Sequence, residues 1–344
     1  MMKRWIGCWV ILIALILPGL SQAEDEKKDE ASETTLEEVV VTANRHEETK
    51  RKIPSNITVI THQEISESGA RNLTDLLKTR ANLHVRDLNG TGSQAIVDLR
   101  GLGGDNPYGK TLVLLDGRRM NRPDMSSINW LQVPLQLIES VEIVRGTNTV
   151  MYGDSAVAGV INIITKKGAT QPQTSVSVIL GENGSNVERA GTIGSTEKLY
   201  YAVNAEHQGN DGWRKRSAFK SSGGGLNIGY DLTDSLSVSF NGSYNKTEFE
   251  IPGNLTKAEM AADRTQSQPA RTWFPPAWFP FPASTPAHTE DESENEYINA
   301  NLLLEGSLGE AGNVEVNFLW GNKDIKTDMP SYWPPGQYNM LDIN

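Results

Sequence analysis

The sequence predicts an α+β domain over residues 51–170, with a small mixed sheet and short helices, followed by antiparallel transmembrane β-barrel strands over residues 171–344. Two observations predict this division. Before residue 170, short strand patterns alternate with capped helix patterns, as in a compact α/β unit. After it come segments of about ten residues in which every second residue is apolar, the pattern of an outer-membrane barrel.

The composition fits such a fold and argues against several other classes. The net charge of −11 makes a nucleic-acid partner unexpected. A hydrophobic content of 38% suits strands that are apolar on one face. The single cysteine, Cys8, lies in a segment that we expect to be removed, so the mature chain should have no disulfide and no thiol chemistry.

The first 23 residues have the features of a secretory signal peptide. Lys3 and Arg4 precede the apolar run Trp5–Leu17, which is too short for a comfortable membrane span. A small-x-small cleavage site ends at Ala23. We therefore expect export, with cleavage near Ala23.

Residues 24–50 form a linker that contains one exposed strand pattern. Glu24–Thr35 is charged, has no apolar periodicity and is expected to be disordered. Leu36–Arg45 (LEEVVVTANR) follows it, and the centre of this segment, Val39–Thr42, has strong β propensity. Two interpretations stay open from the residues alone: a docking peptide that adds a strand to another protein's sheet, or the first strand of the next domain.

Short helices and strands are expected to alternate through residues 51–170. Thr61 and Glu64 form a capping box, Asn72 caps a second helix, and Pro134 suits the first turn of a helix that runs to about Ile138. Strands are expected at Asn56–Ile60, Leu83–Arg86, Gln94–Arg100, Thr111–Leu115, Val141–Arg145 and Val160–Thr165.

No enzyme site, cofactor or metal centre is predicted. Gly104–Thr111 (GDNPYGKT) matches the phosphate-loop pattern, but an apolar strand-like run follows where the motif requires a helix. A nucleotide-binding enzyme is therefore only an alternative class, in which Lys110 would be essential. The five histidines are scattered without metal-ligand spacing, and no G-x-S-x-G motif occurs.

Seven alternating segments follow residue 170 and predict barrel strands. Their Asn- and Ser-rich faces alternate with faces that carry Tyr and Trp, which favours a wet lumen and a lipid-facing wall over a secreted β-sandwich. The predicted strands are Thr174–Leu180, Val187–Gly194, Lys198–Gln208, Gly223–Asp231, Ser235–Thr247, Glu296–Gly306 and Asn313–Lys323.

The long outer loop, residues 251–294, contains the aromatic and proline-rich stretch Arg271–Pro282 (RTWFPPAWFPFP). Long loops of outer-membrane barrels face outside. Ligand capture by this stiff apolar surface is one interpretation, and packing over the barrel mouth or the lipid headgroups is the other.

Residues 36–324 resemble a TonB-dependent outer-membrane receptor. Leu36–Arg45 resembles the TonB box, and Ile57–Lys167 resembles the plug domain. The resemblance depends on DLRGLGG at Asp98–Gly104, LVLLDGRRM at Leu112–Met120, IESVEIVRG at Ile138–Gly146 and YGDSAVAGVINIITKK at Tyr152–Lys167.

The resemblance implies energised uptake across the outer membrane of a Gram-negative-type bacterium, with outer-membrane lipid around the barrel. The implied ligand is a ferric siderophore, with cobalamin, haem or a glycan as alternatives. A TonB-like periplasmic energy transducer would bind the TonB box, at Glu38, Val39, Val40, Val41 and Thr42.

Four charged residues of the α+β domain are candidates for contact with the enclosing wall. Arg100, Arg145, Glu139 and Glu142 lie at predicted strand or helix ends, where they form either a solvated face or ion pairs with a wall. The resemblance implies that Arg100 and Arg145 face the wall, because both stand in the family's two RG motifs.

Ligand is expected to meet the outer loops and the tips of the plug, near residues 89–93 and 121–129. The candidate ligand-binding residues are Asn89, Ser93, Asn121, Asn129, Trp273, Phe274, Trp278 and Phe279.

The chain is shorter than a plugged barrel requires. Such a barrel takes about 22 strands of roughly ten residues each, more than the residues after 170 can supply. We therefore expect a fragment or a truncated gene product, with an incomplete barrel. The alternative class is a soluble periplasmic binding or signalling protein that uses the plug alone.

Overall fold

The computed structural model describes residues 40–41, 48–49, 56–87, 90–102, 109–122, 128–147, 149–272, 284–285, 287, 290–309 and 312–329. The chain divides into two units, Met1–Glu38 and Val39–Asn344. The predicted signal peptide and most of the linker lie outside the described residues.

A five-stranded mixed sheet organises the α+β domain, which we define as residues 56–168. Its strand order is β3-β8-β9-β6-β7, and β6 runs parallel to β9 while the other neighbours are antiparallel. The strands are β3 (Asn56–Thr61), β6 (Thr111–Leu115), β7 (Arg118–Arg119), β8 (Ile138–Arg145) and β9 (Gly159–Thr165). The predicted small mixed sheet is confirmed.

The first two helices begin at the predicted caps. In α2 (His62–Glu67), the Thr61 N–H donates to the Glu64 carboxylate at 2.8 Å and the Glu64 N–H donates back to Thr61 Oγ1. In α3 (Leu73–Thr79), the Asn72 side chain accepts from the Asp75 N–H at 2.9 Å. The remaining short elements are α4 (Thr149–Tyr152), the 3-10 helix η2 (Trp130–Gln132) and the paired strands β4 (His84–Arg86) and β5 (Ile96–Asp98).

The helix expected from Pro134 is shorter than predicted. Only a 3-10 turn, η3 (Leu135–Leu137), follows Pro134, and Ile138 already begins β8. Ile138 is fully buried and pairs with Thr165 of β9. Ile138, which the local signals placed in the helix, therefore belongs to the sheet.

Apolar side chains cover both faces of the central strands. On β9, Ile161 and Ile163 join one core cluster, with α3 and Trp130, while Val160 joins a second cluster with Leu112 and Val144. Strands buried on both sides read as continuous apolar runs, which is why Val160–Thr165 shows no alternation.

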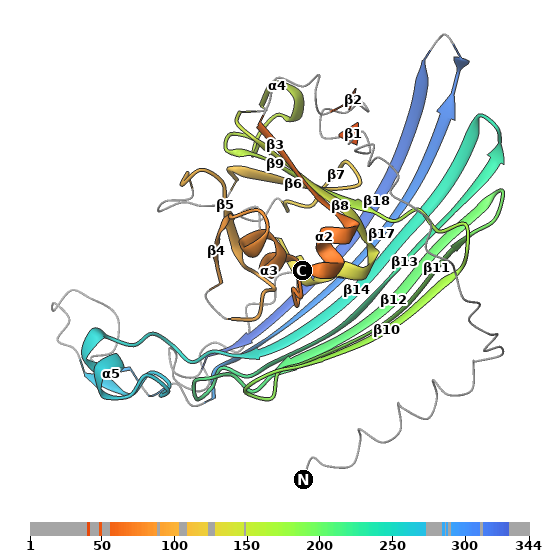
Figure 1. The fold of residues 1–344 in the computed structure, drawn as a ribbon. Coiled ribbons are helices and arrows are strands. Elements are labelled where there is room, and N and C mark those ends of the chain that lie inside the picture. Colours follow the sequence, from red (N-terminus) through yellow and green to blue (C-terminus); the bar gives the residue numbers. More distant parts are fainter. Residues whose placement is uncertain are drawn as a thin grey trace, which may run out of the picture. The chain divides into compact units, whose positions relative to one another are not determined.

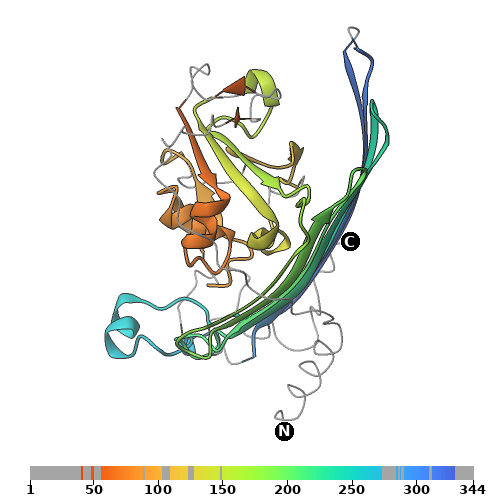
Figure 2. The ribbon, with the colours of Figure 1, turned by 45° about the vertical axis from the view of Figure 1, so that its right-hand side comes forward.

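The seven predicted barrel strands form one antiparallel sheet, which we call the wall. Its order is β10-β11-β12-β13-β14-β17-β18. Figure 1 shows these strands side by side, and Figure 2 shows that the sheet curves around the α+β domain. The wall is not closed, as expected for an incomplete barrel. The strands are β10 (Gln173–Leu180), β11 (Asn186–Ser195), β12 (Leu199–Asn210), β13 (Phe219–Thr233), β14 (Leu236–Glu250), β17 (Glu292–Ser307) and β18 (Asn313–Asp328).

Several strands extend beyond their predicted ends. The segment predicted as Gly223–Asp231 is the 15-residue strand β13, which pairs with β14 out to Phe219 and Phe249. In these extensions, polar residues such as Lys220 and Glu248 oppose each other across strands. Backbone pairing continues there although the apolar alternation has ended.

The connections differ between the two ends of the wall. Short turns at residues 196–198 and 234–235 join strands at one end. At the other end, residues 181–185 form a short turn, residues 211–218 form a longer connection, and the chain between β14 and β17 forms the longest one. Long loops of outer-membrane barrels face outside, so we call the second end the outer end. Its loop contains α5 (Lys257–Ala262) and the strand pair β15 (Arg271–Thr272) and β16 (Ser284–Thr285). Within the described residues, no helix has the length and apolarity to cross a membrane.

The close approach at Gly159 supplies a test of the α+β sheet. A Cβ at Gly159 (φ +154°) would lie 2.3 Å from the Val144 carbonyl oxygen, whereas one at Gly146 (φ +127°) would meet nothing within 4 Å. Both alanine variants strain the backbone, so Gly146→Ala is the matched control. We expect Gly159→Ala to lower the free energy of unfolding by about 2 kcal/mol more than the control.

Hydrogen exchange of β8 and β9 in the purified protein measures this difference. Equal losses for the two variants would show that the contact with Val144 does not limit the packing of the sheet.

Candidate functional site: the interface between the α+β domain and the wall

The outward face of the wall is an apolar band. Its central row consists of register partners on five neighbouring strands: Tyr201, Ile228, Phe240, Leu302 and Phe318. On β14, the outward positions from Leu236 to Tyr244 span roughly 20 Å, given the rise per residue and the tilt of barrel strands. This height is close to the apolar band of an outer-membrane barrel, about 25 Å.

Charged side chains border this band toward the outer end. The next outward rows hold paired ions, with Lys220 and Lys246 on Glu248, and Lys246 and Lys326 on Glu294. These ion pairs are partly exposed, so they add little to stability. Their position instead marks where the apolar surface ends.

The inward face is polar and largely buried. Asn204, Asn227, Asn245, Thr247, Asn295 and Asn301 are each at most 7% exposed. Buried amides require hydrogen-bond partners, and the α+β domain supplies several of them. The interface is therefore held by polar contacts more than by apolar packing.

A buried polar chain links Ser93 to β14. Ser93 Oγ donates to Asn129 Oδ1, and Asn129 Nδ2 donates to Asn245 Oδ1 at 2.9 Å. Asn245 in turn donates to Ser221 on β13, and Thr247 donates to Asn245 Oδ1. All five side chains are at most 2% exposed.

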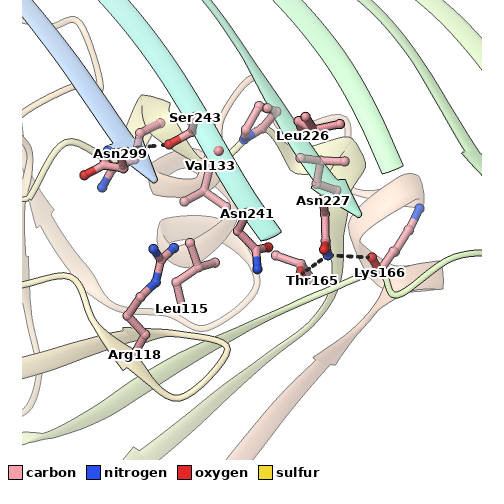
Figure 3. A pocket seen from close by; sticks show the side chains of 15 residues that line it. Leu115, Arg118, Val133, Thr165, Lys166, Leu226, Asn227, Asn241, Ser243 and Asn299 are labelled. Atoms are coloured by element: carbon pink, nitrogen blue, oxygen red, sulfur yellow. Dashed lines mark hydrogen bonds between the residues drawn. The ribbon is translucent and has the colours of Figure 1, made fainter. Parts of the chain in front are cut away.

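Two further amide contacts flank this chain (Figure 3). Asn299 Nδ2 on β17 donates to Gln132 Oε1 of η2 at 2.8 Å, and Figure 3 shows its second bond, to Ser243. Asn227 Nδ2 on β13 lies within 3.5 Å of both Thr165 Oγ1 and the Lys166 carbonyl. The space between these contacts is a cavity of only about 40 Å³, so this part of the interface is close-fitting.

A buried ion pair joins β11 and β12 to the start of α3. Arg189 Nε donates to Glu206, and Arg189 Nη2 donates to the Arg71 carbonyl. Both charged side chains are less than 10% exposed. Buried pairs are costly to break by removing one partner, so Arg189 ties the wall to the residue before the Asn72 cap.

The four predicted wall contacts occupy different positions. Arg145 donates to Thr58 Oγ1 and to the Ala81 carbonyl, both inside the α+β domain. Glu142 is 1% exposed and accepts from Asn162 of β9. Arg100, with φ +65°, and Glu139 are exposed. The sequence did not reveal the side chains that do cross the interface, because strand register decides which asparagines face the domain.

The predicted ligand-binding residues that the structure describes are buried. Ser93 and Asn129 belong to the polar chain to β14. Asn121 accepts from the Val113 N–H and donates to the Thr111 carbonyl. Their side chains thus hold the α+β domain together and attach it to the wall. The other candidates, Asn89, Trp273, Phe274, Trp278 and Phe279, lie outside the described residues.

The centre of the predicted TonB box is paired as a strand. Val40–Val41 form β1, which pairs antiparallel with β2 (Glu48–Thr49). Glu38, Val39 and Thr42 lie outside the described residues.

Lys110 of the phosphate-loop pattern has a structural partner. Its Nζ donates to the Leu102 carbonyl at 2.7 Å, and β6 begins at the next residue. The helix that would hold phosphates does not follow. Among the described residues, no group of three or more His, Cys, Asp or Glu side chains could hold a metal ion.

Arginine side chains hold the outer loop together. Arg214 donates to the carbonyls of Pro252, Gly253 and Gln266, which ties residues 211–218 to the loop beyond β14. Arg271 makes two bonds to the Glu259 carboxylate of α5, at 3.0 and 2.6 Å. This loop is therefore folded close to the wall before the aromatic stretch begins.

The hydrogen bonds of Asn245 supply a test of the interface. Asn245→Ala removes the partner of Asn129 and of the Thr247 hydroxyl, which should cost about 1–3 kcal/mol. Asn241→Ala is the control, since Asn241 lies on the same face of β14, four residues earlier. We expect faster hydrogen exchange in residues 128–133 for Asn245→Ala alone. Similar exchange in both variants would contradict the anchoring role of Asn245.

The Glu259–Arg271 pair predicts how the outer loop responds to pH. The Arg271 guanidinium, together with the Thr256 N–H, lowers the pKa of Glu259 from 4.5 to about 2. Because the folded pKa is depressed, this stabilisation is complete above pH 4.5 and is lost as the pH falls toward 2. The protection factors of wild-type residues 254–271, which correct for the pH dependence of intrinsic exchange, should therefore stay high down to pH 4.5 and fall below it.

Glu259→Gln should show low protection factors at every pH, and Lys257→Gln on the same helix serves as the control. High protection factors in Glu259→Gln at neutral pH would mean that the pair does not hold the loop.

Comparison with protein families identifies the α+β domain. Residues 49–160 match the model of the TonB-dependent Receptor Plug Domain. The vitamin B12 transporter BtuB of Vibrio cholerae serotype O1 is 37% identical over 145 residues, 42% of this chain and 23% of that protein. The BtuB of Photobacterium profundum is 29% identical over 251 residues, 70% of this chain and 39% of that protein. The chain thus spans less than half the length of these relatives.

Solved structures share the arrangement of domain and wall. The ferric yersiniabactin uptake receptor FyuA from Yersinia pestis has a TM-score of 0.62 at 15% identity, covering 79% of this chain and 41% of FyuA. The unliganded ferric citrate transporter FecA has a TM-score of 0.60 at 20% identity, covering 79% of this chain and 40% of FecA. At these identities the likeness concerns the fold. The plug match and the BtuB relatives support a TonB-dependent receptor, of which this chain carries the plug domain and part of the barrel wall.

Proposed function

We propose that this chain provides the plug and part of the wall of a receptor that takes up a scarce ligand across the outer membrane. This proposal is supported by the wall, which is apolar on its outward face and polar on its inward face. Its inward asparagines make hydrogen bonds with the α+β domain. A domain held by exchangeable hydrogen bonds closes the pore at rest and can be displaced when work is done on it. The mechanism is binding and gating, without covalent chemistry.

Energy would enter through the TonB box. A TonB-like periplasmic transducer would pair with Glu38–Thr42 by strand addition, in which backbone bonds give affinity. Val40–Val41 pair with Glu48–Thr49 in a two-stranded sheet, so the partner's strand would add to the other edge of β1 or replace β2. Ligand occupancy on the outer side would favour that pairing.

The proposed location is the outer membrane, reached after removal of the signal peptide near Ala23. Arg100 and Glu139 are exposed on the α+β domain and remain proposed contacts for the enclosing wall. Asn89 and the four aromatic residues Trp273, Phe274, Trp278 and Phe279 remain proposed ligand contacts. A soluble periplasmic protein is the competing class, and membrane fractionation separates the two.

The ligand class has two candidates. A ferric siderophore is the ligand that the family resemblance suggests first, and the named ligands of FyuA and FecA are iron chelates. Cobalamin is favoured by the relatives found through sequence, three of which are BtuB proteins at 29–37% identity. We place cobalamin first, because likeness to the solved structures concerns the fold alone. Competition between cyanocobalamin and a ferric siderophore for surface binding distinguishes them.

Deleting Glu38–Thr42 tests the energised step. We expect loss of uptake to the level of a strain without TonB, while surface binding of the same ligand changes less than about twofold, because the outer loops and the wall are untouched. A deletion of equal length in Glu24–Thr35 is the control, since it shortens the linker without removing the strand. Undiminished uptake after deletion of Glu38–Thr42 would refute the docking role.

A further inference from the structure

The α+β domain fits the wall unevenly. Against β13 and β14 the residual cavity is about 40 Å³. A second cavity, beside β14, β17 and β18, is about 200 Å³, and a third, between α2, η3 and strands β10–β12, is about 370 Å³. The third cavity extends along the wall, from Arg189 near the outer end of β11 to Gln173 and Lys166 at the opposite end. We call it the α2 cavity.

The lining of the α2 cavity combines apolar side chains, such as Ile65, Leu135 and Ile179, with polar ones. Some of the polar groups have no partner among the described residues. Asn204 on β12 is 6% exposed, and neither its Oδ1 nor its Nδ2 bonds to another described residue. The same holds for Oε1 of Gln136 on η3. An unsatisfied buried polar atom costs about 1–3 kcal/mol. Such atoms at the rim of a cavity indicate a polar occupant there.

The anchoring of the α+β domain is also uneven. Strands β13, β14 and β17 hold it through Asn227, Asn245 and Asn299. Between the described residues of the domain and strands β10–β12, the hydrogen bond from Arg189 to the Arg71 carbonyl is the contact of this kind. If the domain is pulled, the free energy needed to separate it from the wall is lowest where a cavity already lies between them. The α2 side therefore opens before the β13–β14 side.

We propose that the passage for ligand opens along the α2 cavity and that Asn204, Gln136 and Ser177 contact the ligand in transit. This inference rests on the proposed uptake function and assigns its route. At about 30 Å³ per water molecule, the resting cavity holds on the order of a dozen waters. A large ligand therefore passes only after the domain has moved. Amide and hydroxyl groups suit a ligand rich in hydrogen-bonding groups, as the corrin amides or siderophore carbonyls would be.

Single cysteines test the route. Ser177→Cys on β10 places a thiol in the α2 cavity, and Ser243→Cys on β14 places one where the two smaller cavities, of about 40 and 200 Å³, adjoin. Both are inward serines, so the substitutions are matched, and Cys8 lies in the predicted signal peptide. In cells expressing the receptor, we measure modification by a membrane-impermeant methanethiosulfonate, with and without TonB, and uptake and surface binding of radiolabelled cyanocobalamin and a ferric siderophore.

We expect TonB-dependent modification at Ser177→Cys and a fall in uptake of about tenfold after it, with surface binding unchanged. Modification at Ser243→Cys should be slow and independent of TonB. Equal effects at both positions, or TonB dependence at Ser243→Cys alone, would overturn the route while leaving wild-type uptake intact. Absent wild-type uptake of both probes would instead overturn the proposed function and the route with it.

A second pair of variants distinguishes direct contact between Asn204 and the passing ligand from mere accessibility of the α2 cavity. Asn204→Leu removes the unpartnered amide from the α2 cavity, and Asn301→Leu removes a similarly buried amide, with an unpartnered Oδ1, from β17. We expect slower uptake without weaker surface binding for Asn204→Leu alone. Equal uptake in the two variants would contradict the contact assigned to Asn204.

Discussion

The wall can exist only if each of its two faces meets the right neighbour. Lipid cannot satisfy polar groups, so the outward row of Tyr201, Ile228, Phe240, Leu302 and Phe318 must be apolar. The inward face is then free to be polar, but its asparagines are too buried to be left to solvent. In the α+β domain, Asn129, Gln132 and the turn after β9 supply hydrogen-bond partners for these asparagines. The interface follows from the chemistry of the bilayer as much as from the fold of the domain.

A polar interface suits a domain that has to leave its place. Breaking apolar contacts costs free energy in proportion to the apolar area that becomes exposed to water. A hydrogen bond to an amide can instead be replaced by a hydrogen bond to water at little net cost in free energy. The amide contacts on β13, β14 and β17 are of this exchangeable kind. Arg189 differs, because its buried pair with Glu206 stays within the wall and only its bond to the Arg71 carbonyl crosses the interface. Movement of the domain breaks that bond without separating the two charges.

The sequence predicted the elements better than the contacts. Alternation located all seven wall strands, and the Thr61 and Asn72 caps located two helices, because these signals are local. The helix predicted after Pro134 was too long, because Ile138 pairs with Thr165 in the sheet, and this pairing is not visible in the local sequence. Ser93 and Asn129 were expected at a ligand surface but are buried. Their partner, Asn245, is 116 residues from Asn129 in the chain. Nothing in either segment encodes the register that brings them together.

The described partners of Arg145 likewise depend on the fold and not on its motif. A guanidinium at a strand end carries five donors and is satisfied by whichever acceptors lie nearest. In this fold those acceptors are Thr58 on the neighbouring strand β3 and the Ala81 carbonyl just beyond α3. Arg145 thereby ties the sheet to the helix layer, and α3 is in turn held to the wall through Arg71 and Arg189. A force that acts on the domain near β3 can therefore be transmitted to the wall through successive hydrogen bonds. The first two join β3 to Arg145 and Arg145 to the residue Ala81 just beyond α3. At the other end of α3, the Arg71 carbonyl accepts from Arg189 on the wall. The bond between Arg189 and Arg71 is the last one on that path, and it borders the α2 cavity.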